Sequence, residues 1–245
     1  MEKQCFDHAW RFHLGDYPGS RWHDPDDSSW RLLDLPHDWS IELDRDPASP
    51  VGASGGYFPT GMGWYRKRFV APEEWRGKKV FIEFEGVYMN AEVWLNGRFL
   101  GRHPYGYTSF HYDLTPYLNV GSKNLLKVQV DNTCQPNSRW YSGSGIYRHV
   151  WLMVADPVHV AHWGVYVTTP EVSPERALVR VRTTVENESG AACEATVRSR
   201  IIAPDGTSVG TVESRAEINA GGRHEYVQDV EVTGPQLWSP DTPHL

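Results

Sequence analysis

The chain has 245 residues, and its 31 acidic side chains outnumber its 24 lysines and arginines, giving a formal net charge of −7 at pH 7. A nucleic-acid-binding surface is disfavoured, because the basic side chains are scattered among acids and form no stripe that would neutralise phosphates. The length is enough for one large or two ordinary domains with proper cores, and we expect two.

The cysteines and the N-terminus indicate a reducing compartment. The three cysteines, Cys5, Cys134 and Cys193, are odd in number and far apart, so neither a disulfide framework nor a zinc site is expected. The first ten residues contain no apolar signal core, and no apolar stretch is long enough to span a bilayer. We therefore expect a cytoplasmic protein with no membrane partner and no nucleic-acid partner.

Short alternating runs between turn signals predict antiparallel β-sandwiches and no long helices. The runs Val80–Phe84 and Ala91–Leu95 each place alternate apolar residues on one face of a strand. The second run ends in Asn96-Gly97, and both of these residues tolerate a positive φ. A tight hairpin is therefore expected between Glu92 and Leu100.

Two further elements are expected before the middle of the chain. Thr115 is predicted to cap one short helical turn, with Pro116 at its first position. A strand follows in which Leu126, Val128 and Val130 alternate with polar residues, which places Asp131 at the strand's end on the opposite face.

A long polar and aromatic loop follows this strand, from Asp131 to Arg148, and it is the strongest candidate for a ligand contact. A carboxylate accepts hydrogen bonds from two hydroxyls, and an amide both donates and accepts, as sugar recognition requires. An Asp-Asn pair at the end of a strand is equally typical of turn chemistry. Arg148 is interpreted as a buried ion-pair partner that pins the return of the loop.

The character of the sequence changes near Asp156-Pro157. Of the eleven tryptophans, only Trp163 and Trp238 lie beyond this point, and short apolar runs alternate with turn signals. This pattern predicts an immunoglobulin-like sandwich. We count four or five strands where such a sandwich usually has about seven, so we expect it to be C-terminally incomplete.

Several segments in order resemble glycoside hydrolase family two, especially its β-galactosidases. They are Phe6–Asp16, Leu35–Glu42 (L-P-H-D-W-S-I-E), Gly61–Phe69 (G-M-G-W-Y-R-K-R-F), Glu92–Gly101, Ser138–Arg148 (S-R-W-Y-S-G-S-G-I-Y-R) and Leu237–Leu245. The resemblance implies a jelly-roll sugar-binding domain over residues 1–156, an immunoglobulin-like sandwich over 157–245, and a (β/α)₈ barrel that this stretch does not include.

In this family the catalytic pair consists of two glutamates on barrel strands, about 5 to 5.5 Å apart in retaining enzymes. No catalytic residue is therefore expected here, and the stretch should be inactive alone. The resemblance implies that Asp131 or Asn132 binds a β-galactoside hydroxyl beside the barrel. It also implies that Arg139, Trp140 and Tyr141 line the pocket or pack against the barrel, and for Trp140 we expect the barrel. The resemblance also makes Asp131 a candidate sodium ligand, with sodium and magnesium in the complete enzyme and no cofactor in this stretch alone.

One departure from the family pattern and one misleading match accompany the resemblance. Val51–Gly56 stands where well-known members have an asparagine that contacts the sugar. Asn187–Gly190 (N-E-S-G) has the letters of a barrel acid/base motif but lies in a polar turn, so Glu188 is not expected to be catalytic.

The alternative functions are a stand-alone carbohydrate-binding module, a structural sandwich tandem that binds protein, and the same region of a β-glucuronidase or β-mannosidase. An incomplete second sandwich would also leave a sheet edge for pairing into a homo-oligomer.

Overall fold

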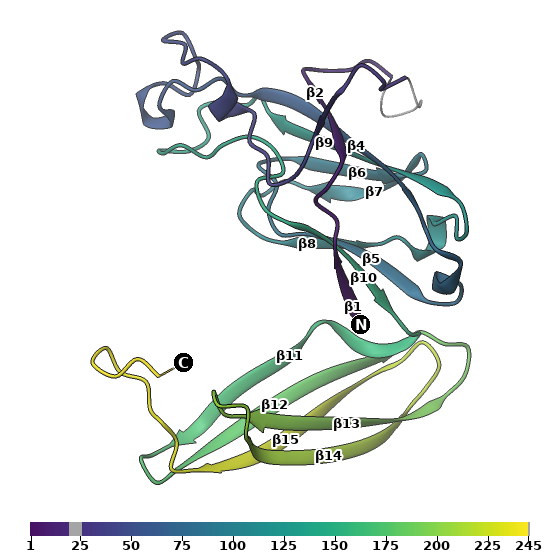
Figure 1. The fold of residues 1–245 in the computed structure, drawn as a ribbon, viewed down its shortest axis with the longest axis vertical. Helices are drawn as coiled ribbons and strands as arrows, with labels where there is room; N and C mark the ends of the chain where they lie inside the picture. Colours follow the sequence, from purple (N-terminus) through teal and green to yellow (C-terminus); the bar gives the residue numbers. More distant parts are fainter. Residues whose placement is uncertain (20–25, 245) are drawn as a thin grey trace. The chain divides into compact units, whose positions relative to one another are not determined.

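The computed structural model describes residues 1–19 and 26–244. The chain divides into two compact units, Glu2–Ala155 and Asp156–Leu245, with Met1 assigned to the latter (Figure 1). Regular structure in the described residues is almost entirely β-strand, and the helical segments are single 3₁₀ turns. The expected all-β chain with a jelly-roll sandwich followed by an immunoglobulin-like sandwich is confirmed. No helix in these described ranges has the length and apolarity to cross a membrane.

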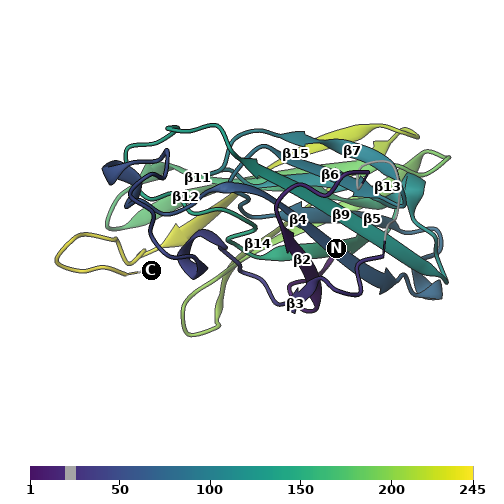
Figure 2. The same cartoon turned by 90° about the horizontal axis from the view of Figure 1, so that it is seen from above.

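The first unit consists of two antiparallel sheets that enclose one core (Figures 1 and 2). The larger sheet has the strand order β3-β2-β4-β9-β6-β7, and the smaller has the order β1-β10-β5-β8. The strands are β1 (Glu2–Cys5), β2 (Trp10–Leu14), β3 (Arg31–Leu33), β4 (Gly61–Val70), β5 (Lys79–Phe84), β6 (Ala91–Leu95), β7 (Arg98–His103), β8 (Phe110–Asp113), β9 (Lys123–Asn132) and β10 (Val150–Ala155). The 3₁₀ turns are η1 (Ser40–Glu42), η2 (Ala53–Gly55), η3 (Glu73–Trp75) and η4 (Thr115–Tyr117).

Strand β9 lies between β4 and β6 and is covered on both faces. Leu126, Val128 and Val130 are fully buried in the core, as the alternation predicts. The opposite face is covered too, because Lys127 and Gln129 are each only 2% exposed. Because both faces are covered, β9 is packed firmly up to its last residues, where the Asp131–Arg148 loop begins.

The β6–β7 hairpin forms as predicted, and Asn96 and Gly97 take φ values of 50° and 80°. The interpretation of Thr115 as a helix cap is wrong, because Thr115 is already inside η4. Its hydroxyl instead accepts a hydrogen bond from the Val80 amide of β5 at 2.9 Å. The Asp113 carboxylate accepts from the Thr115 amide at 2.8 Å, so an aspartate two residues earlier organises this turn.

The second unit has a three-stranded sheet in the order β11-β12-β15 and a two-stranded sheet formed by β13 and β14. Its strands are β11 (Val158–Val172), β12 (Arg176–Asn187), β13 (Cys193–Ile202), β14 (Ser208–Ile218) and β15 (Arg223–Thr233). Its core contains Val185, Ile218 and Tyr226, and the Tyr226 hydroxyl donates across to the Ala195 carbonyl at 2.8 Å. The chain turns at Asp205-Gly206 and at Gly221-Gly222, where Gly206 and Gly221 have φ values of 86° and 67°.

Candidate functional site

The end of β9 places Asp131 at the rim of the larger sheet, half-buried. Its Oδ1 atom accepts hydrogen bonds from the Thr133 amide at 3.0 Å and from the Thr133 hydroxyl at 2.6 Å. This is the turn chemistry that an Asp at a strand end favours. The Oδ2 atom makes no hydrogen bond with the part of the chain that the structure describes, so one carboxylate oxygen is left to accept from a ligand.

Asn132 is fully buried and organises the loop from inside. Its Nδ2 donates to the Gly143 carbonyl at 3.1 Å and to the Ser144 hydroxyl at 2.8 Å. Its Oδ1 accepts from the side-chain amides of Gln135 at 2.7 Å and Asn137 at 2.8 Å. All four partners belong to the loop, so Asn132 holds its two ends together and offers no exposed atom to a sugar.

Tyr141 is 38% exposed and is tied to the segment before β4. Its hydroxyl donates to Oδ2 of Asp38, and its ring packs against Phe58 at a centroid distance of 4.9 Å. Partial burial and the neighbouring Asp38 carboxylate raise the pKa of the Tyr141 phenol well above its usual range. Asp38 also accepts from the Ser144 amide at 2.8 Å, which fixes Tyr141 and the loop to the same carboxylate.

Trp140 and Arg139 are the exposed members of the loop. Trp140 is 57% exposed, and its indole Nε1 donates to the Tyr107 hydroxyl at 2.8 Å, so the ring is held at one edge. Arg139 is exposed and has no hydrogen-bond or ion-pair partner among residues 1–19 and 26–244. The loop therefore presents an aromatic face and an available guanidinium to solvent.

A shallow hollow lies between this loop and the segment that contains η2. It is lined by Ser40, Val51, Gly55, Phe58, Thr60, Gln135, Ser138, Trp140, Tyr141, Ser142 and Gly143. Val51 and Gly55 come from the stretch where well-known family members have a sugar-contacting asparagine, so that stretch does reach the candidate loop. The backbone is close-packed there, because a Cβ on Gly55 would lie 2.7 Å from the Val51 side chain.

The sequence interpretation missed Asp38, Phe58, Tyr107 and Gln135. Asp38 lies in the quoted L-P-H-D-W-S-I-E segment, and its Oδ1 accepts from the Ser40 amide at 3.0 Å. That local turn is detectable from sequence, whereas its pairing with Tyr141, 103 residues away, is not. Arg148 does form an ion pair, at 3.5 Å from a Glu85 carboxylate oxygen, but the expectation that it is buried is wrong, because its side chain is 58% exposed.

The side chains at this site are suited to binding a ligand. Asp131 offers one carboxylate oxygen, Trp140 an aromatic face for the apolar side of a pyranose ring, and Arg139 five donors in a fixed fork. Asp131 belongs to no group of three or more His, Cys, Asp or Glu ligands in the described residues, and Thr133 engages its Oδ1. The role of Asp131 as a sodium ligand stays a prediction.

Known protein families and relatives match almost the whole length of the chain. Residues 4–156 match the family model described as glycosyl hydrolases family 2, sugar binding domain, and residues 158–245 match the model described as glycosyl hydrolases family 2. A β-galactosidase of Bacteroides ovatus, BoGH2A, is 49% identical over 100% of this chain and 29% of that protein. A β-glucuronidase of Formosa agariphila is 31% identical over 89% of the chain and 24% of that protein.

Solved structures agree with these matches. A glycosyl hydrolase family 2 member from Bacteroides cellulosilyticus superposes with a TM-score of 0.90 and 38% identity, covering 100% of this chain and 33% of that one. A β-glucuronidase from Bacteroides uniformis has a TM-score of 0.87 and 28% identity, covering 99% of this chain and 29% of that one. The chain thus spans about a third or less of the length of these relatives.

Proposed function

Because the chain belongs to glycosyl hydrolase family 2, we propose that it is the non-catalytic leading part of a retaining β-glycosidase, with β-galactosidase as the preferred activity. The proposed role of the Asp131–Arg148 loop is to form one wall of the substrate pocket, beside a catalytic barrel outside this chain. The observation that carries the proposal is a loop braced from within, which starts at the open oxygen of Asp131 and lines the hollow with Trp140 and Tyr141.

The division of labour within the loop supports this role. Asn132 and Asp38 use their polar atoms on the protein, and these hydrogen bonds brace the loop. Asp131, Arg139 and Trp140 are left for a ligand. Hydrogen bonds to a sugar hydroxyl away from the reacting carbon can be stronger in the transition state than in the ground state, so such a residue raises kcat without touching the reacting atoms.

The test uses the protein in which this chain is joined to its catalytic domain, with p-nitrophenyl β-galactoside as substrate. Asp131→Asn weakens one charge-assisted hydrogen bond, so we expect kcat/KM to fall about 10- to 100-fold. Asp205→Asn is the matched control, because Asp205 caps Thr207 through the same two contacts, at 2.9 and 2.7 Å, in the second unit. Equal kcat/KM for the two variants would contradict a substrate-binding role for Asp131.

The isolated 245-residue chain supplies a second test. We expect no hydrolysis of p-nitrophenyl β-galactoside above buffer, and calorimetric binding of galactose or lactose that is millimolar or absent. Micromolar binding supports the stand-alone carbohydrate-binding module instead, and hydrolysis by the chain alone contradicts the assignment of catalysis to another domain. Association of two copies stays a prediction, which light scattering on the same sample checks.

A β-glucuronidase is the second candidate function, and Arg139 favours it. Its exposed guanidinium is available to form a bidentate pair with a carboxylate, and a glucuronide carries a carboxylate that a galactoside lacks. In the same joined protein, Arg139→Gln should lower kcat/KM for p-nitrophenyl β-glucuronide about 10-fold or more if the glucuronide is the substrate. An unchanged ratio of glucuronide to galactoside turnover excludes this role for Arg139.

A further inference from the structure

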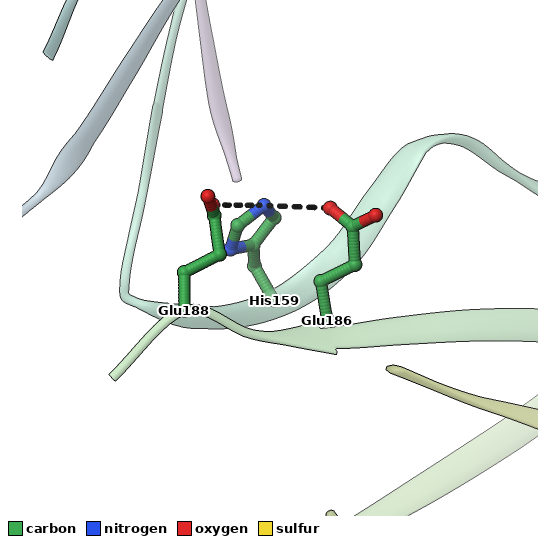
Figure 3. Close-up of side chains that lie close together, drawn as sticks. All are labelled: His159, Glu186 and Glu188. Carbon is green, nitrogen blue, oxygen red and sulfur yellow. Dashed lines mark ion pairs between the residues drawn. The ribbon is translucent and has the colours of Figure 1, made fainter. Parts of the chain in front are cut away.

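A buried histidine in the second unit faces two carboxylates (Figure 3). His159 belongs to β11, Glu186 lies directly opposite it on β12, and Glu188 follows the last residue of β12. The Nε2 atom of His159 lies 3.9 Å from Oε2 of Glu186 and 3.7 Å from Oε2 of Glu188. One ligand atom from each of the three residues falls within 4.8 Å of the others.

A hydrogen bond at the other ring nitrogen fixes the orientation of the imidazole. Its Nδ1 lies 2.8 Å from the Asp156 carbonyl oxygen, which can only accept a hydrogen bond, so Nδ1 carries the proton. In the neutral ring the lone pair is then on Nε2, the nitrogen that points at the carboxylates. A backbone carbonyl that holds the second ring nitrogen is the usual support for a metal-binding histidine. The side chain is 3% exposed, so its position is set by packing.

The two glutamates are placed on one side of the chain by the residue between them. Asn187 is fully buried, and its Nδ2 donates to the Ala191 carbonyl at 2.8 Å and to the Ile218 carbonyl at 2.9 Å. Because Asn187 points inward, the side chains before and after it point outward together. The Glu188 amide donates to the Pro157 carbonyl at 2.8 Å, which fixes this turn against the start of β11.

We propose that His159, Glu186 and Glu188 form a binding site for a divalent first-row transition ion of the Zn²⁺ type. An imidazole nitrogen with two carboxylate oxygens is a suitable set of three protein ligands, and water takes the fourth position. Bonds of about 2.0 to 2.2 Å in a tetrahedron place ligand atoms about 3.3 to 3.6 Å apart. The His159 nitrogen lies 3.9 and 3.7 Å from the two carboxylate oxygens, a few tenths of an ångström beyond this range. The side chains of Glu186 and Glu188 are 35% and 33% exposed, and they close the rest of the set, which lies within 4.8 Å, by turning toward the ion.

The site links β11 to the turn after β12, so binding of the ion stabilises the second unit. The N-E-S-G letters at residues 187–190 thereby have a local explanation. Asn187 is the buried anchor of the turn, and Glu188 is a metal ligand. Calcium is disfavoured, because it requires six to eight oxygen ligands and this site offers two carboxylates and a nitrogen.

The test is calorimetric titration of the tag-free, chelator-treated chain with Zn²⁺ alone, together with the visible absorption of added Co²⁺. We expect one Zn²⁺ per chain and the absorption bands of tetrahedral Co²⁺. Glu186→Gln and Glu188→Gln should each weaken Zn²⁺ binding at least about 10-fold. Glu213→Gln is the matched control, since Glu213 is an exposed β14 carboxylate paired with Arg198, and it should leave Zn²⁺ affinity unchanged.

Both glutamates lie at the surface, so their Gln variants should fold, and far-ultraviolet circular dichroism checks this. His159→Gln is the third variant, and in it tetrahedral Co²⁺ absorption should be lost. Zn²⁺ affinity that is unchanged in both glutamate variants overturns the site. Binding of Ca²⁺ or Mg²⁺ that is as tight as that of Zn²⁺ overturns the assignment to a transition ion.

Discussion

Replacing Asn132 with alanine should uncouple the candidate loop from the jelly roll. The side chain is fully buried at the end of β9, and its amide forms four hydrogen bonds with Gln135, Asn137, Gly143 and Ser144. These partners come from both ends of the loop. Alanine removes all four bonds and leaves the Gly143 carbonyl without the amide that satisfies it.

The cost can be worked out from the burial of the partners. A hydrogen bond inside a protein contributes a net of about 0.5 to 1.5 kcal/mol, and a buried group left unsatisfied costs about 1 to 3 kcal/mol. The bonds to Gly143 and Ser144 are buried, whereas water can replace those to Gln135 and Asn137 at the half-exposed rim. We therefore expect a loss of about 2 to 3 kcal/mol, or roughly 4 to 12 °C in the unfolding midpoint of a unit of this size.

Urea unfolding followed by tryptophan fluorescence is a suitable assay, because nine of the eleven tryptophans precede residue 156 and report on the first unit. Asp131→Ala is the neighbouring control. It removes only the two contacts to Thr133 at the half-exposed rim, and we expect a loss of about 0.5 to 1 kcal/mol. A double-mutant cycle with Ser144→Ala should give a coupling of at least about 0.5 kcal/mol.

An Asn132→Ala stability within about 0.5 kcal/mol of the parent refutes the reasoning, since that is the range of ordinary surface substitutions. A cost equal to that of Asp131→Ala would refute it as well. Either result means that the loop is held by its other contacts, such as those to Asp38, and that the buried amide is exchangeable with water.

Three further predictions concern the first unit. Gly63→Ala should cost about 1 to 3 kcal/mol in urea unfolding, because its Cβ would lie 2.7 Å from the Trp39 ring, whereas Gly190→Ala, with nothing within 4 Å, should be close to neutral. Burial raises the pKa of Tyr112 to about 12, so above pH 10 the unfolded phenol releases its proton first and stability falls until about pH 12. Tyr112→Phe should remove up to about 2 kcal/mol of that alkaline loss, measured as urea midpoints at pH 9 and 11.5. Trp140→Ala should change stability by less than about 0.5 kcal/mol, because its side chain is 57% exposed, yet lower kcat/KM in the joined enzyme.

Local patterns were enough to predict the sandwiches, because each depends on residues close together in the chain. The β6–β7 hairpin follows from Asn96-Gly97, since both residues take a positive φ at little cost. The wrong prediction of Thr115 as a helix cap also came from a local signal. A threonine before proline is a good cap in isolation, but here its hydroxyl satisfies the Val80 amide of a neighbouring strand. That contact spans 35 residues, and no local signal specifies it.

The candidate site likewise has one feature that local sequence predicts and one that it does not. Its position after β9 was predictable, whereas its bracing was not, because Asp38 meets Tyr141 only when strands distant in sequence are paired. The His159 cluster was missed for a related reason. Glu186 and Glu188 are close in sequence, but their histidine is brought opposite them by the β11–β12 register. The spacing of possible metal ligands along the chain therefore does not predict this cluster.

The alternation of β9 also separates the two neighbouring candidates for sugar contact. Asn132 falls on the same side of the strand as Leu126, Val128 and Val130, so its side chain enters the core and must find hydrogen-bond partners there. Asp131 falls on the other side, where one oxygen closes a turn with Thr133 and the second accepts no hydrogen bond from the described residues. Turn formation and ligand binding are therefore compatible roles for one carboxylate. The turn determines where the open oxygen points, and this is why Asp131 is the residue on which the substrate-binding test is built.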